Sequence, residues 1–165
     1  MIVVGYLRLA GTGTFGIDSS HLAYSVTNVS GDCTFIDLAK TDMTVQVTVS
    51  SLVAATSMAA LARVTNSNTF YYATIDINVN NFTVYKLNAG TATQIGTTQA
   101  YTFTAGDIIE IACVGSTISG RVIRAAATLV STSGTDTTFA TQTKCGIRPG
   151  YAGSGNSRIS KFTAV

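Results

Sequence analysis

Few side chains in this sequence could act as an acid, a base or a nucleophile. Glu110 is the only glutamate and His21 the only histidine, and the aspartates are spread along the chain. Hydrolysis of a glycosidic bond needs a pair of carboxyl groups flanking the sugar, and no compact acid pair suggests such a site. Ser19, Ser20 and Asp18 adjoin His21, but neighbours in sequence rarely form a catalytic triad, and no nucleophile elbow is present. The sequence therefore predicts a protein that is not an enzyme.

Cation binding is the next chemistry to consider. Aspartates in turns and at strand ends supply the oxygen ligands that calcium prefers, but they more often cap the turns themselves. With one histidine and no CxxC pair, a zinc site is not expected. We predict no cofactor and keep calcium as the open alternative. The aspartates expected in such turns are Asp18, Asp32, Asp37, Asp42 and Asp136.

The cysteines Cys33, Cys113 and Cys145 each lie in an apolar stretch. Their odd number cannot close entirely into intramolecular disulfides. We predict that all of them are reduced thiols and that at least two are buried. Reduced thiols are typical of a protein made in a reducing cytoplasm.

The chain carries little charge: 11% of its residues are charged, against about 25% in an average protein. Its polar surface must come from Thr, Ser, Asn and Gly, which suits contact with identical subunits or with neutral partners such as sugars. The net charge of +2 includes no basic cluster, so nucleic acid is not a predicted partner. The sequence has no run of about 18 apolar residues, so membrane insertion is not predicted. The opening MIVVGYLRLAG lacks the features of a signal peptide.

Short runs rich in Val, Ile, Thr, Tyr and Phe alternate with Gly and Asn turns, as in all-β sandwiches and barrels. Within Met43–Val49, Tyr71–Ile77 and Ile109–Cys113, apolar residues recur at every second position, which is the strand period. One face of each strand should therefore lie in the core. The predicted core residues are Met43, Val45, Val47, Val49, Tyr71, Ala73, Ile75, Ile77, Ile109, Ile111 and Cys113.

The segment Leu52–Val64 is harder to assign, because its Ala, Leu and Met content could form a short helix. We interpret it as a turn followed by a strand over Met58–Thr65. Near the end, Gly150–Ser157 is predicted to be a loop and Arg158–Ala164 a closing strand. Since no linker or change of composition divides the chain, we predict a single domain over 1–165, an all-β, two-sheet antiparallel β-sandwich.

Five segments carry a family resemblance. In Arg63–Thr98 an Arg-containing strand precedes an aromatic strand and a K-x-x-x-G hairpin turn at Lys86–Gly90. Gly106–Val122 contains paired strands, Thr132–Gly150 has an Asp-Thr-Thr turn before a strand, and Arg158–Ala164 closes the chain. This arrangement resembles the jelly-roll domains of the concanavalin-A-like lectin/glucanase superfamily, which includes laminin-G-like domains. FGIDSSHLAYS near the start is similar to the family's opening strand.

The resemblance implies a sugar-binding or adhesion sandwich without catalysis. The glutamate pair on one strand of the glucanases is missing, and the metal signature of legume lectins is not visible. Lys161 stands where an aspartate often precedes the Phe of the last strand, and this departure weakens any metal or polar role there.

Two functions remain. The first is a non-catalytic structural or adhesion protein of a bacteriophage particle, in a head decoration, tail or fibre. Its partners would be identical subunits, other virion proteins and host-surface glycans. The reduced cysteines, the charge-poor surface and the missing leader favour this location in a virion. The alternative is a carbohydrate-binding module of a secreted, extracellular enzyme or adhesin.

Either role could include a glycan site, which needs an aromatic platform and a few polar groups. The more common role of each candidate tyrosine is that of a core or sheet-packing residue with its hydroxyl satisfied. The sequence has no Trp, the strongest stacking side chain, which argues against tight sugar binding. The glycan-binding candidates are Arg63, Tyr72, Tyr85, Arg148 and Tyr151.

Overall fold

The computed structural model describes residues 15–17, 19–25, 33–52, 57–149 and 157–165. Within these ranges the regular secondary structure consists of β-strands alone. No helix long and apolar enough to cross a membrane is found among these residues. The strands are β1 (Phe15–Ile17), β2 (Ala23–Ser25), β3 (Thr34–Asp37), β4 (Met43–Ser51), β5 (Ser57–Asn66), β6 (Thr69–Asp76), β7 (Asn81–Asn88), β8 (Thr91–Ala100), β9 (Ile108–Val114), β10 (Thr117–Arg124), β11 (Ala127–Thr135), β12 (Lys144–Pro149) and β13 (Arg158–Ala164).

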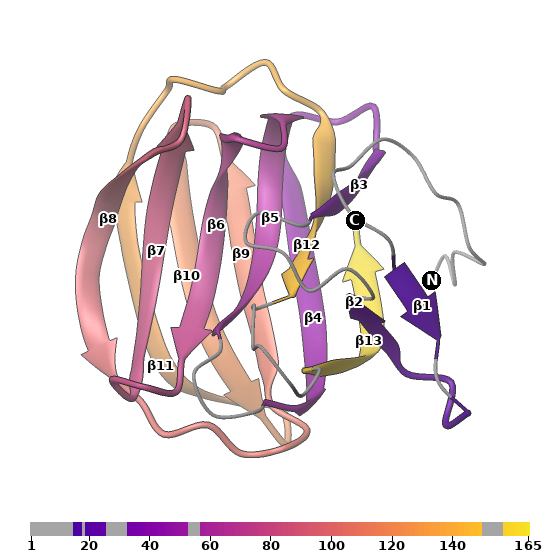
Figure 1. Ribbon diagram of the computed structural model, residues 1–165. Coiled ribbons are helices and arrows are strands. Elements are labelled where there is room, and N and C mark those ends of the chain that lie inside the picture. The colour runs from indigo at the N-terminus through magenta and orange to yellow at the C-terminus, as the bar shows by residue number, and fades with distance from the viewer. Residues whose placement is uncertain (1–14, 18, 26–32, 53–56, 150–156) are drawn as a thin grey trace.

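The strands form two antiparallel sheets that pack face to face (Figure 1). The seven-stranded sheet has the order β1-β2-β13-β4-β9-β10-β11, and the six-stranded sheet has the order β3-β12-β5-β6-β7-β8. Strands β5 to β8 are consecutive hairpins of the six-stranded sheet, and β9 to β11 are consecutive hairpins of the other. The predicted all-β sandwich is therefore confirmed.

The core lies between the two sheets. Apolar residues at every second position along the central strands point into this space. The predicted core faces of β4, β6 and β9 are confirmed, because their apolar residues are at most 2% exposed and belong to one buried cluster. Ile77 is the exception: β6 ends at Asp76, so Ile77 lies in the following turn and is half-buried.

The ambiguous segment is a strand rather than a helix. β5 runs over Ser57–Asn66, in agreement with the predicted strand Met58–Thr65, and the closing strand β13 has the predicted bounds. The opening segment differs from the single strand expected. It forms two short paired strands, β1 and β2, around a turn that contains Ser19 and Ser20, whose side chains favour turns over strands. His21 in this turn is exposed and has a φ of 63°.

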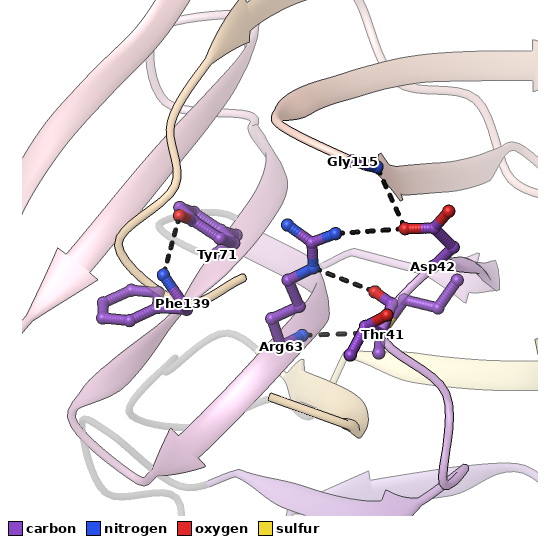
Figure 2. Close-up of polar contacts among 7 residues, drawn as sticks. Thr41, Asp42, Arg63, Tyr71, Gly115 and Phe139 are labelled. Atoms are coloured by element: carbon purple, nitrogen blue, oxygen red, sulfur yellow. Dashed lines mark hydrogen bonds and ion pairs between the residues drawn. The ribbon is translucent and has the colours of Figure 1, made fainter. Parts of the chain in front are cut away.

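A clamp at one end of the sandwich joins the two sheets. The segment after β11 crosses this end to reach β12 (Figure 1). Asp136 in that segment accepts hydrogen bonds from the Tyr71 hydroxyl at 2.5 Å and the Lys86 ammonium group at 2.6 Å. Figure 2 shows the Phe139 N–H donating in turn to the Tyr71 hydroxyl, at 3.2 Å. Burial, together with the bond to Asp136, raises the pKa of Tyr71 to about 12.

A second clamp is built on Asp107, whose side chain is completely buried. Arg124 donates to it from Nε at 2.7 Å and from Nη2 at 3.0 Å, the Thr104 N–H donates at 2.7 Å, and the Tyr101 hydroxyl donates as well. Burial by itself raises the pKa of Asp107. The hydrogen bonds from Arg124, Tyr101 and Thr104 outweigh burial, so the pKa lies below the ordinary 3.8.

This lowered pKa makes a prediction about acid stability. Asp107 stabilises the fold at pH values above its unfolded pKa, and the contribution is lost as the pH falls through its folded pKa. We expect the free energy of unfolding to fall between about pH 5 and pH 2. Asp107→Asn should be less stable at neutral pH and depend less on acid. Urea unfolding across this range measures both effects, and an equal acid dependence in the two proteins would contradict the assignment.

All of the cysteines are buried thiols, at 0% exposure, as the sequence predicted. Burial raises the pKa of Cys113 and of Cys145 to about 12 each. Because the thiolate is the reactive form, we expect a thiol reagent to modify at most one cysteine of the native protein and all of them after denaturation. Rapid modification of two or more cysteines in the native protein would contradict this packing.

Candidate functional site

Two tyrosines stack on the outer face of the six-stranded sheet, the side turned away from the core. Tyr72 in β6 is directly opposite Tyr85 in β7, and their ring centroids lie 5.2 Å apart with an interplanar angle of 22°. Both side chains are half-buried. Alternation explains their position, because Tyr71 and Val84, which are next to them in sequence, belong to the core. We call Tyr72 and Tyr85 the tyrosine pair.

Apolar side chains border the tyrosine pair on one side. A second buried cluster lies on this outer face and is formed by Cys33, Phe35, Ala59, Leu61, Val64, Phe70 and Leu87. Tyr72 packs against this cluster, and the Phe70 ring meets it edge-on at 5.7 Å and 76°. These contacts restrict the orientation of the Tyr72 ring. The tyrosine pair is therefore an ordered aromatic surface.

Polar side chains border the pair on its other sides. Gln94 in the edge strand β8 is opposite Tyr85. Two residues from the tyrosine pair along the same strands, Thr74 of β6 is opposite Thr83 of β7. The Thr83 hydroxyl donates to the Thr98 hydroxyl at 3.2 Å. The sheet thus places hydroxyl and amide groups within one or two residues of two aromatic rings.

Arg148 reaches the same neighbourhood from β12. It is opposite Ala59 in β5, which belongs to the outer apolar cluster, so Arg148 shares the face of the tyrosine pair. Burial raises the pKa of Tyr72, and the positive charge of Arg148 partly offsets this increase. The Tyr72 hydroxyl therefore stays protonated at neutral pH.

Arg63 does not share this face, although simple alternation along β5 would place it there. The pairing of β5 with β6 shifts after Ala62, and Arg63 has a φ of 49°. Such an irregularity re-aims a side chain. The side chain of Arg63 is 1% exposed, donates from Nε to the Thr41 carbonyl at 2.9 Å and lies 3.4 Å from Asp42 (Figure 2). It is a structural group rather than part of an open glycan site.

The structure thus brings together Tyr72, Tyr85 and Arg148, whereas Tyr151 lies outside the described residues. Sequence reasoning missed Thr83, Gln94 and Thr98, because their nearness depends on strand register rather than on a local motif. A hairpin pairing drawn through the turn after Asn88 would have placed Gln94 beside Tyr85.

The aspartates considered for calcium bond to the protein itself. Asp37 accepts from the Ala39 N–H at 2.8 Å, and Asp42 accepts from the Gly115 N–H at 2.9 Å (Figure 2). Asp18 and Asp32 lie outside the described residues. In the part of the chain that the structure covers, no group of three or more His, Cys, Asp or Glu side chains could hold a metal ion.

No protein-family model and no curated protein matches this chain, but solved structures do. The carbohydrate-binding module CBM66 from Bacillus subtilis matches with a TM-score of 0.64 and 12% identity over 93% of this chain and 91% of the module. Sheep galectin-11 matches with a TM-score of 0.53 and 8% identity over 81% of this chain and 96% of the galectin.

An enzyme also contains this fold. The GH43 protein BlXynB from Bacillus licheniformis matches with a TM-score of 0.59 and 10% identity over 92% of this chain, which spans 36% of the length of that protein. At such identities the likeness concerns the fold. The chain therefore has the jelly-roll sandwich fold of carbohydrate-binding modules and galectins, in agreement with the lectin/glucanase-like resemblance of its sequence.

Proposed function

We propose that this protein is a non-catalytic carbohydrate-binding module that holds its glycan on the outer face of the six-stranded sheet, at the tyrosine pair. The observation that carries the proposal is the stack of Tyr72 on Tyr85, half-exposed on a sheet face, in a fold shared with a carbohydrate-binding module and a galectin. In a soluble protein, an aromatic pair that is not buried in the core is a common element of a binding surface.

The chemistry of this face suits a neutral, hydroxyl-rich ligand. The aromatic rings offer apolar area to the C–H groups of a sugar ring, while Arg148, Gln94 and the exposed Thr98 offer donors and acceptors to its hydroxyls. The raised pKa of Tyr72 keeps its hydroxyl neutral. We therefore expect binding that changes little between about pH 6 and pH 8, because none of the described residues on this face has an ordinary pKa within that range.

The single glutamate does not offer a general acid. Glu110 lies on the outer face of the other sheet, where Arg121 and Gln46 hold both of its oxygens. A glycosidase would need a protonated carboxyl opposite an ionised one. The position and bonding of Glu110 support a module that binds without cleaving.

The virion role stays a prediction. Its support is the charge-poor composition, whereas the likeness to sugar-binding domains supports the module more directly. Three further points are likewise proposals: assembly from identical subunits, a bacteriophage source, and a virion or extracellular location. Light scattering of the purified protein would test the self-assembly that the virion role requires.

The proposed function is tested by affinity electrophoresis through gels that contain single neutral polysaccharides, with a reducing-sugar assay on the same mixtures. We expect at least one polysaccharide to slow the protein and none to release sugar. Unchanged migration in every gel would overturn the binding role. Release of reducing sugar that depends on Glu110 would overturn the non-catalytic assignment.

A further inference from the structure

The outer face of the seven-stranded sheet, on the far side of the sandwich from the tyrosine pair, contains a polar hollow. Its lining comes from the neighbouring strands β9, β10 and β11. The side chains that face it are Glu110, Ser119, Arg121, Ser131 and Ser133, with backbone from Gly120 and Thr132. We call this site the serine hollow.

An ion pair between a buried carboxylate and a half-exposed arginine forms one wall of the hollow. Glu110 is 5% exposed although it points away from the core. Arg121 donates to it from Nε at 2.6 Å and from Nη2 at 3.1 Å, and Gln46 donates at 2.7 Å. This bidentate contact fixes the guanidinium plane, while the Arg121 side chain remains 46% exposed. The wall is thus rigid and close to neutral overall.

Small hydroxyl side chains form the rest of the hollow. Ser119 is opposite Ser133, and Arg121 is opposite Ser131. Among the described residues, the hydroxyls of these serines make no hydrogen bond within the protein, so each is available to donate and to accept. Gly120 forms the floor. A Cβ there would lie 2.4 Å from Val84 Cγ2 of the other sheet, which shows how closely the sheets approach beneath the hollow.

We propose that the serine hollow is a second, weaker glycan subsite, which takes a single neutral sugar unit through its hydroxyls. Glu110 disfavours an anion and Arg121 disfavours a cation, so an uncharged ligand suits the pair. Vicinal hydroxyls match a surface of paired serines beside a fixed guanidinium. Among the described residues no aromatic ring lines the hollow, so it binds by hydrogen bonds alone and more weakly than the tyrosine pair.

This inference rests on the proposed function for its biological meaning. With sites on opposite faces, one module could bridge two glycan chains or two segments of one chain. Two weak contacts to a polymer give an avidity higher than either contact alone.

The test is a backbone-amide NMR titration of the full chain with D-glucose and D-xylose at millimolar concentrations, with inorganic phosphate as a charged control. We expect the amides of residues 119–121 and 131–133 to shift saturably with at least one of the sugars and not with phosphate. The variant Ser131→Val/Ser133→Val fills the hollow with methyl groups on an exposed strand, where Val is well tolerated. It should abolish these shifts and leave those around Tyr72 and Tyr85 unchanged.

The outcomes separate the two proposals. The second subsite is overturned if the amide resonances of the hollow do not shift with either sugar, shift equally with phosphate, or still shift in the double variant. In each of these cases the shifts around Tyr72 and Tyr85 test the tyrosine site independently. If the hollow amides move while those around the tyrosine pair do not, the second subsite stands and the proposed main site fails.

Discussion

Replacing Tyr85 with alanine is expected to lower the affinity for the glycan at least tenfold, without a comparable loss of stability. Tyr85 supplies half of the stacked surface, is half-exposed, and lies outside both buried clusters. Truncation of a central aromatic contact commonly costs about 2 kcal/mol or more, and about 1.4 kcal/mol corresponds to a factor of ten in the dissociation constant. Isothermal titration with the polysaccharide selected in the gels measures the change.

Two controls identify the cause of the loss. Tyr85→Phe keeps the ring and removes the hydroxyl, so it should retain most of the affinity if stacking dominates. Leu129→Ala removes a side chain that is 43% exposed on β11 of the other sheet, and it should bind as the unaltered protein does. Equal affinities for Tyr85→Ala and Leu129→Ala would show that the tyrosine pair is not the binding surface.

Replacing Ile111 with alanine is expected to lower the free energy of unfolding by about 2–5 kcal/mol, because a large buried side chain leaves a cavity when it is truncated. Ile111 is completely buried in the centre of β9, and Ile75 of the facing sheet belongs to the same cluster. Ile75→Ala should have an effect of similar size.

Val114 provides a matched control in the same strand as Ile111. It is 61% exposed, so Val114→Ala should change the free energy of unfolding by less than about 0.5 kcal/mol. Urea unfolding of the three variants gives the comparison. A loss below about 1 kcal/mol for Ile111→Ala would place this residue outside the core and shift the register of β9 by one position.

Much of the fold could be predicted from the sequence, because burial in a sandwich imposes a period of two. The alternation in Met43–Val49 and Ile109–Cys113 identified the core faces directly. The same logic missed the buried outward face of β5, where Ala59 and Leu61 lie under 5% exposed as part of a second cluster. A strand buried on both sides has no clear alternation, which is why helix and strand were hard to distinguish there.

The candidate site was predicted less completely. Tyr72 and Tyr85 were recognised as aromatic residues, but their stacking depends on the register of β6 with β7, which the sequence does not state. Arg63 was a candidate as a polar side chain, but an irregular strand pairing and a positive φ, which no sequence pattern marks, turn it inward. Glu110 could not be placed either, since Gln46 comes from a strand distant in sequence and the contact with Arg121 depends on the register of the β9–β10 hairpin.

The most direct test of the central claim is a crystal structure of the protein with an oligosaccharide from the polysaccharide that it binds. We predict a sugar ring in contact with the tyrosine pair on the outer face of the six-stranded sheet, with hydroxyls within hydrogen-bonding distance of Arg148, Gln94 or Thr98. An oligosaccharide bound elsewhere, with Tyr72 and Tyr85 unoccupied in a crystal that leaves this face open, would contradict the account.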